Sequence, residues 1–260
     1  MPYSIIAFIT ILMGVLSYLL FNYFQEEPIP EGSSSTPLTF ILFDFDGTLI
    51  DAYQEAINVC NELAQEFGFT QISDAERETI RHSSMKEIIS NRKIPWYKVP
   101  QLVYHAKKRM AQKIDIMGPI DGIIPVIRTL KEQGYRLGII TTNRVSSVER
   151  FLKNNDLELF DVIYGDAKLF GKHKSIKRFL KKHTLPREAV VYVGDEVRDI
   201  EAARTVGIKI ISASWGFNSH EKLLASQPTN IIKTPEELVL VINQTDTIDV
   251  NTLQTNLNKS

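Results

Sequence analysis

The sequence predicts an α/β domain, a doubly wound parallel sheet of Rossmann-like topology with a helical insertion after the first strand. Short apolar runs rich in β-branched and aromatic residues recur and mostly do not alternate with polar residues, as in strands covered on both faces. Segments with apolar residues at i, i+3 and i+4 separate these runs, and such alternation of strand and helix is typical of a doubly wound sheet. The 260 residues are enough for one large domain or two small ones.

An uncharged apolar segment, Ser4–Phe24, precedes the predicted domain. About 20 apolar residues in a helix cross the roughly 30 Å hydrocarbon core of a bilayer, and Tyr18 and Tyr23 suit the interface. A cleaved signal peptide is the main alternative, but the segment lacks a basic start and a small-residue cleavage site. We therefore expect residues 1–25 to form an uncleaved single-span transmembrane anchor.

Two further segments carry no sign of packed structure. Residues 26–37 are rich in Pro, Ser and Gly and are expected to form a linker. Residues 244–260 are polar without a sustained pattern and are expected to form a disordered tail.

The predicted strands and helices of the core alternate along the chain. The strands are expected at Thr39–Asp44, Tyr135–Thr141, Phe160–Gly165, Ala189–Asp195 and Ile208–Ser214. The helices between them are expected at Asp121–Gly134, Ser146–Asn155, Ser175–His183 and Arg198–Gly207, the first ending in a glycine suited to a C-cap.

Residues 53–117 break this alternation, because they contain helical patterns and no convincing strand. An insertion of this length needs structure of its own. We therefore expect a helical cap over residues 53–117, and an α/β core assembled from residues 38–52 and 118–243.

Acidic and polar side chains stand where the predicted strands end. Because ligands bind beyond the carboxyl ends of parallel strands, these residues are expected to meet at one edge of the sheet. They are Asp44 and Asp46 after the first strand, Thr141, Thr142 and Asn143 after the second, Lys172 and Lys174 before the third core helix, and Asp195, Glu196 and Asp199 after the fourth strand.

Carboxylates gathered in this way need a cation. Two of them about 4 Å apart repel by roughly 4 kcal/mol at an effective dielectric constant of 20. Mg²⁺ with oxygen ligands removes that repulsion. One carboxylate could then attack phosphorus, while a second protonates the leaving alcohol and a lysine shields the phosphate. Gly47 would permit the sharp turn that keeps Asp44 and Asp46 on the same rim.

The stretches "DFDGT", "TTN", "GK" and "GDEVRD", in this order, resemble the four motifs of the haloacid dehalogenase superfamily. The resemblance covers about Thr39 to Trp215, and the helical insertion after the first motif is similar to that of the branch with phosphoglycolate phosphatase-like enzymes. Its first and last motifs are specific in combination, whereas the middle two are short.

The resemblance implies roles for the acids. Asp44 is similar to the nucleophile, whose carboxylate also binds Mg²⁺. Asp46 is similar to the general acid and base, with its backbone carbonyl on the metal, and favours phosphoryl chemistry because dehalogenases lack it. Asp195 resembles the metal-binding acid of the last motif, and Asp199 the acid that supports it. Glu196 departs from the small hydroxyl residue often found at its position, and we expect it to be a supporting acid outside the metal ligands.

The resemblance also implies a phosphate site, in which Thr141 is similar to the phosphate-binding Ser or Thr and Asn143 lies in the same motif. Thr142 stays an alternative because the doubled threonine blurs the register. Lys172 is similar to the lysine that holds phosphate and nucleophile together, with Lys174 as the alternative.

The expected function is therefore a Mg²⁺-dependent phosphatase acting on a small phosphorylated metabolite through an aspartyl phosphate. The alternatives are a phosphomutase with the same core, a membrane-tethered binding protein without activity, and a phosphonate hydrolase. We expect the catalytic domain on the cytoplasmic side, where Mg²⁺ and metabolite phosphates are found; the charges flanking the apolar segment do not fix its orientation.

Composition excludes some other classes. A formal charge of −1 gives no electrostatic case for nucleic acid. One cysteine, Cys60, excludes an internal disulfide and CxxC metal sites. The middle of the predicted cap is basic, which fits either a solvated helix face or a contact from Arg81 to an anionic substrate. Trp96 and Trp215 are expected to serve packing.

Overall fold

A six-stranded parallel sheet forms the centre of the computed structural model, which describes residues 36–165 and 171–245. The strand order is β3-β2-β1-β4-β5-β6, so β2 and β3 are added on one side of β1 and β4, β5 and β6 on the other, which makes β1 the switch point of the sheet. The strands are β1 (Phe40–Phe43), β2 (Arg136–Ile140), β3 (Val162–Tyr164), β4 (Val190–Gly194), β5 (Lys209–Ala213) and β6 (Asn230–Ile232). The first five lie inside the five predicted runs, and the α/β parallel-sheet prediction is confirmed.

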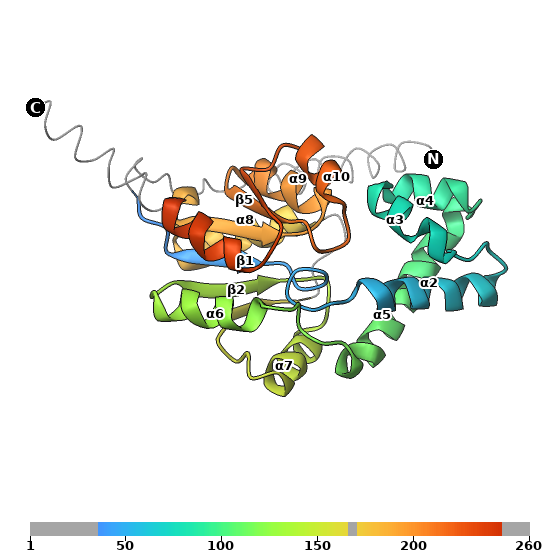
Figure 1. Ribbon diagram of the computed structural model, residues 1–260, viewed down its shortest axis with the longest axis horizontal. Coiled ribbons are helices and arrows are strands. Elements are labelled where there is room, and N and C mark those ends of the chain that lie inside the picture. Colours follow the sequence, from blue (N-terminus) through green and yellow to red (C-terminus); the bar gives the residue numbers. More distant parts are fainter. Residues whose placement is uncertain (1–35, 166–170, 246–260) are drawn as a thin grey trace, which may run out of the picture.

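Helices cover both faces of this sheet (Figure 1). One face packs on α6 (Ile123–Glu132), α7 (Val145–Asn154) and a helical segment over residues 236–245. The other packs on α8 (Lys172–His183), α9 (Val197–Val206) and α10 (His220–Ala225). Both faces of the central strands are therefore buried, which explains why β1 reads as an unbroken apolar run.

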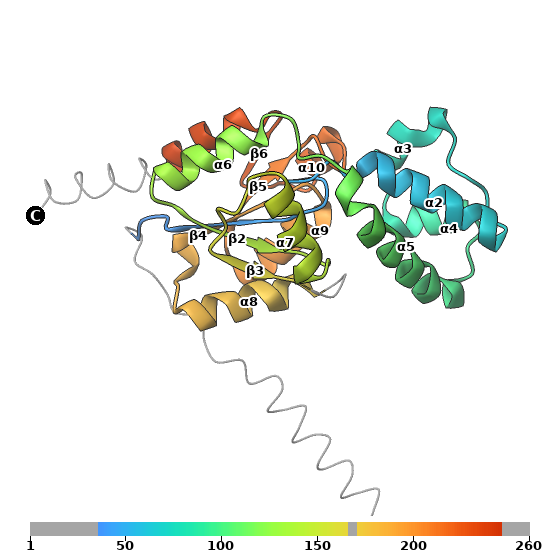
Figure 2. The same ribbon diagram turned by 90° about the horizontal axis from the view of Figure 1, so that it is seen from below.

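Residues 53–116, between β1 and α6, form a separate helical layer beside the core, which we call the cap (Figures 1 and 2). Its elements are α2 (Tyr53–Phe67), η1 (Asp74–Glu76), α3 (Arg77–His82), α4 (Met85–Asn91), η2 (Trp96–Lys98), α5 (Val99–Lys113) and η3 (Ile114–Ile116). Lys113 of α5 pairs with Glu55 and Glu62 of α2, each at 2.9 Å, so ion pairs join these two long helices.

Three C-terminal elements were not predicted. They are β6, α10 and the helical segment over residues 236–245. A three-residue strand and a six-residue helix are too short for periodicity to show. They form because Leu223, Ile232, Leu238 and Ile242 bury their side chains against the sheet and its helices.

One prediction about packing was wrong. Trp215 packs against the core as expected, and its indole Nε1–H donates to the Thr48 carbonyl at 3.3 Å. Trp96 instead lies on the cap surface with 83% of its area exposed.

Nothing in the described structure bears out a membrane span. Within residues 36–165 and 171–245, none of the helices has the length and hydropathy that a span requires. The predicted anchor, linker and tail lie wholly or largely outside these ranges, so their boundaries stay predictions.

Candidate active site

The register of the sheet brings three motifs to one edge. Phe43, the last residue of β1, lies level with Ile139 of β2 and Val193 of β4. The residues that follow these strands therefore emerge side by side at the switch point, where parallel sheets bind ligands.

Three buried aspartates gather at this edge. Asp44 follows β1, Asp195 follows β4, and Asp199 lies in the first turn of α9. Asp44 is 3% exposed and the other two are fully buried. One carboxylate oxygen of each lies within 4.8 Å of the others, as ligands of a common ion would.

Lys172, at the start of α8, lies between two of these acids. Its Nζ is 2.8 Å from Asp44 Oδ2 and also donates to Asp199 Oδ1. Burial opposes the charge of this ammonium group, but Asp199 and Asp44 outweigh burial and hold its pKa well above the usual value. Lys174 is exposed. The structure therefore places Lys172, and not Lys174, among the acids.

Asp195 is held by groups that the sequence reasoning missed. Thr48 Oγ1 donates to its Oδ1 and the Phe217 N–H donates to its Oδ2, each at 2.7 Å. Gly47 and Gly216 lie so close that a Cβ on either would stand 2.4 Å or less from Asp195 Oδ2. Burial first, and then the charges of nearby acids, raise the Asp195 pKa well above its usual value.

Asp46 has a different environment on the rim. It is partly exposed, and the Asn143 side-chain amide donates to its Oδ2 at 2.8 Å. Burial, and then the charge of Asp44, raise the pKa of Asp46 to about 6, although the hydrogen bond from Asn143 lowers it. Asp46 can therefore change its protonation state near neutral pH, as a general acid and base must.

Thr141 and Thr142 differ in position. Thr141 is fully buried, and its hydroxyl accepts a hydrogen bond from the Asn143 N–H at 3.1 Å. Thr142 is partly exposed. Which of these two threonines contacts phosphate stays a prediction.

Glu196 and Asp199 shape the start of α9. The Glu196 N–H donates to Asp199 Oδ2 at 3.1 Å, while the Glu196 carboxylate pairs with Arg198. The Asn218 side chain accepts from the Val197 N–H at 3.0 Å. Glu196 was expected to be a supporting acid, and in the structure its carboxylate pairs with Arg198, a partner that the sequence did not indicate.

The three aspartates fit a hard divalent cation. Asp44 Oδ2 is buried without a hydrogen-bond partner, although it is ion-paired with Lys172. Three carboxylates against one lysine leave an excess of negative charge in a buried place, which is costly unless a cation is bound. Carboxylate oxygens are the ligands that Mg²⁺ prefers.

The cap contacts the loop that holds Asp195. Arg81 of α3 donates from Nη2 to the Ser214 carbonyl at 3.2 Å, and its guanidinium lies 5.5 Å from the Tyr53 ring centre. The Tyr53 ring in turn packs edge-on against Phe217, with 5.7 Å between ring centres. Arg81 thus links cap and core through a backbone carbonyl.

A protein-family model described as haloacid dehalogenase-like hydrolase matches residues 41–213, about two thirds of the chain. The chain belongs to the haloacid dehalogenase-like hydrolase family.

Relatives of this family member carry phosphatase names. A protein named phosphoglycolate phosphatase, from Synechococcus elongatus, is 28% identical over 205 residues, which is 78% of this chain and 97% of that protein. A protein named pyrophosphatase PpaX, from Listeria innocua, is 25% identical over 219 residues, covering 79% and 96% of the two chains.

Two solved structures share the fold. A haloacid dehalogenase-like hydrolase from Streptococcus pneumoniae superimposes with a TM-score of 0.67 at 26% identity, covering 80% of this chain and 99% of the other. A predicted phosphatase from Clostridium acetobutylicum gives 0.68 at 20% identity, covering 80% and 100%, a likeness that shows the fold alone.

Proposed function

We propose that this hydrolase is a Mg²⁺-dependent phosphatase that acts on a small phosphate monoester through an aspartyl phosphate. One observation carries the proposal. Asp44 lies at the switch point of the sheet, its Oδ2 is 2.8 Å from Lys172 Nζ, and one of its oxygens lies within 4.8 Å of oxygens of Asp195 and Asp199. Asp46, two residues on, accepts a hydrogen bond from the Asn143 side chain.

Asp44 is the nucleophile in this proposal. Its carboxylate attacks phosphorus as the bond to the leaving alcohol oxygen breaks, and Asp46 gives that oxygen its proton. Asp46 then takes a proton from the water that attacks the aspartyl phosphate and releases inorganic phosphate.

Positive charge must offset the approach of a phosphate dianion to buried carboxylates. Lys172 supplies part of it, while Thr141 or Thr142, with Asn143, would orient the phosphate. Asp44, Asp195 and the Asp46 backbone carbonyl would hold Mg²⁺, with Asp199 in support. Bound Mg²⁺ supplies Lewis-acid stabilisation of the phosphoryl group.

The relatives suggest two substrates. The match to a protein named phosphoglycolate phosphatase supports a small phosphorylated acid, and the matches to proteins named pyrophosphatase support inorganic pyrophosphate as a second candidate. In this proposal Arg81, whose guanidinium lies over the Tyr53 ring next to Phe217, would contact an anionic substrate as the cap closes.

Phosphate release by the full chain in detergent, with Mg²⁺ and a panel of phosphomonoesters and pyrophosphate, tests the proposal. Asp44→Asn should abolish release, and Lys174→Gln should keep it. Steady release without a bisphosphate activator would exclude a phosphomutase. Lack of hydrolysis of every ester by the folded protein would favour a binding protein, and borohydride trapping of an imine would favour a phosphonate hydrolase.

We propose further that Ser4–Phe24 anchors the enzyme as a single span, with the catalytic domain on the cytoplasmic side. The absence of charged residues over this length supports the span. Carbonate extraction of membranes should leave the chain in the pellet, and protease added to sealed inside-out vesicles should digest the domain. Release by carbonate would contradict the anchor.

A further inference from the structure

The cap carries an exposed aromatic surface. Trp96, Tyr97 and Tyr104 are 83%, 63% and 64% exposed. The Trp96 and Tyr97 rings lie edge to face, 6.2 Å between centres. Trp96 and Tyr97 belong to η2, and Tyr104 lies on α5 directly after it. Three large aromatic side chains within nine residues are thus open to solvent.

The same stretch is strongly basic. Residues 88–114 contain seven Lys and Arg and no Asp or Glu. Arg92, Arg109 and Lys113 pair with acids of the cap. Within the described part of the chain no carboxylate pairs with Lys93, Lys107 or Lys108, all of which are exposed. Tyr97, Tyr104 and Lys108 are spaced by seven and four residues along η2 and α5, with Trp96 and Lys107 beside them, so these five side chains share one side of the helical segment. We call this surface the aromatic–basic face, and its two lysines make it positively charged.

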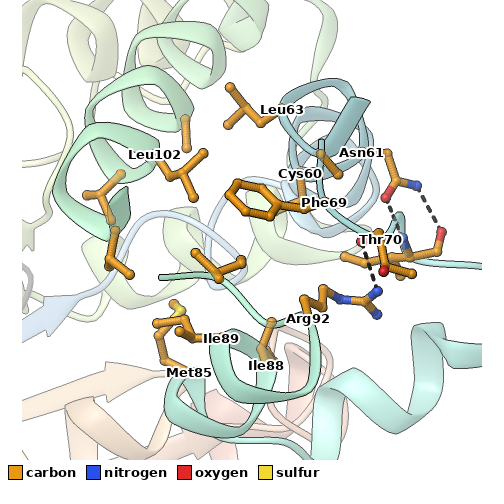
Figure 3. Close-up of a pocket in the computed structure, with 16 residues that line it drawn as sticks. Cys60, Asn61, Leu63, Phe69, Thr70, Met85, Ile88, Ile89, Arg92 and Leu102 are labelled. Carbon is orange, nitrogen blue, oxygen red and sulfur yellow. Dashed lines mark hydrogen bonds between the residues drawn. The ribbon is translucent and has the colours of Figure 1, made fainter. Parts of the chain in front are cut away.

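This face is not the apolar side of α5. Figure 3 shows Leu102 of α5 turned toward Leu63 and Phe69, into an apolar cavity of about 180 Å³ inside the cap. Val103 and Ala106, about one and two turns after Val99 on α5, line the same cavity together with Val99. One side of helix α5 thus packs against the interior of the cap, and Tyr104, Lys107 and Lys108 are not part of the cavity lining.

We propose that the aromatic–basic face binds the surface of an anionic lipid bilayer. Trp and Tyr favour the interface, where an apolar ring meets a polar edge. Unpaired lysines are attracted to anionic headgroups within a Debye length. Charge complementarity thus favours an anionic membrane.

The geometry tells how the molecule would lie. The start of β1 and the cap stand at opposite ends of the structure (Figures 1 and 2). Contact through the cap, together with a tether before β1, lays the long axis along the membrane. A tether would raise the effective concentration of the cap at the surface, but the proposal does not require one.

The two tryptophans of the chain allow a direct test. The full chain is mixed with vesicles of phosphatidylcholine, with or without phosphatidylglycerol, that carry bromine on their acyl chains as a quencher. Subtracting the fluorescence of Trp96→Phe from that of the wild type leaves the signal of Trp96. We expect this signal to shift to the blue and to be quenched on anionic vesicles.

Charge variants test the lysines. At about 1 kcal/mol per lysine, each removal weakens the docking equilibrium roughly 5-fold, so Lys107→Gln/Lys108→Gln should weaken it about 30-fold. Lys153→Gln/Lys182→Gln, an equal charge change on the core, should leave Trp96 quenching as in the wild type.

Three results would overturn the proposal. The first is protein that stays with the vesicles while Trp96 is unquenched, which rejects the face and leaves the anchor standing. The second is quenching that ignores both lipid charge and the Lys107 and Lys108 substitutions. The third is a Trp96 shift that appears without lipid and grows with protein concentration, which assigns the face to a second copy of the chain.

Discussion

Lys172→Met tests the electrostatic design of the active site. Lys172 is 3% exposed and is the cation between Asp44 and Asp199. Methionine keeps most of the side-chain volume, so the variant removes charge without opening a large cavity. In the absence of Mg²⁺, it leaves two buried carboxylates without their shared ammonium group.

The magnitude follows from the distance. At 2.8 Å and an effective dielectric constant of 20, Lys172 and Asp44 attract by about 6 kcal/mol. The desolvation of both groups offsets part of this attraction, and removal of one partner from a buried ion pair typically costs about 3–5 kcal/mol. We expect the free energy of unfolding in EDTA to fall by that amount.

The loss should depend on pH. Burial raises the pKa of Asp199 to about 6 in the wild type, and Lys172 is the first group that opposes this rise. A carboxyl with a raised folded pKa binds its proton more tightly when folded, so stability falls as pH rises from about 4 to the folded pKa. Without Lys172 the folded-state pKa of Asp199 rises further, so the pH range over which stability falls extends above pH 6. The difference between wild type and variant should therefore grow from pH 5 to pH 8.

Urea unfolding of the full chain in detergent, followed by circular dichroism at both pH values, measures the loss. Lys174→Met, an equal change at an exposed position, should stay within about 0.5 kcal/mol of the wild type. Lys172→Met/Asp199→Asn should recover part of the stability without recovering activity, because it removes one of the two unpaired charges and leaves Asp44. A loss below about 1 kcal/mol, or one that shrinks with rising pH, would refute the reasoning.

Three further predictions concern the same site. Gly47→Ala should lower the free energy of unfolding by more than about 2 kcal/mol, because a Cβ there would clash with Asp195 and Phe217. Gly134 has a similar positive φ but open space around it, so Gly134→Ala should cost about 1 kcal/mol, and equal losses in urea titrations would contradict the close approach at Gly47. Mg²⁺ at 100 times its dissociation constant should stabilise the wild type by about 2.7 kcal/mol in thermal unfolding and leave Asp195→Asn unchanged; equal stabilisation of both would place the metal elsewhere. Arg81→Ala removes a charged hydrogen bond between cap and core, so kcat/KM should fall about 10-fold with urea unfolding of the core unchanged; an unaltered kcat/KM would mean that this contact does not serve closure.

The sequence carried much of the fold because local patterns expressed it. Apolar runs and helical spacing placed the first five strands and most of the helices, since both faces of the sheet are buried. The short elements β6 and α10 escaped prediction because their stability comes from tertiary packing. Trp96 was predicted to pack, yet it is exposed, because residue type alone does not say which side of a helical insertion meets the interior.

The site divides in the same way. The identity and order of Asp44, Asp46, Asp195 and Asp199 could be read from the chain, since the first three follow apolar strands and Asp199 comes one helical turn after Asp195. The choice of Lys172 over Lys174 could not, because both stand at the start of one helix and only the register of α8 against the sheet brings one ammonium group to Asp44.

The linear order of residues determined which acids stand at the ends of strands, because strand formation is local and its apolar pattern is visible. Only the tertiary structure decided what surrounds those acids. Thr48 and Gly47 lie in the loop after β1, while Gly216 and Phe217 lie in the loop after β5, and both loops enclose Asp195. Thr48 and Asp195 are 147 residues apart, and no local pattern records so distant a contact.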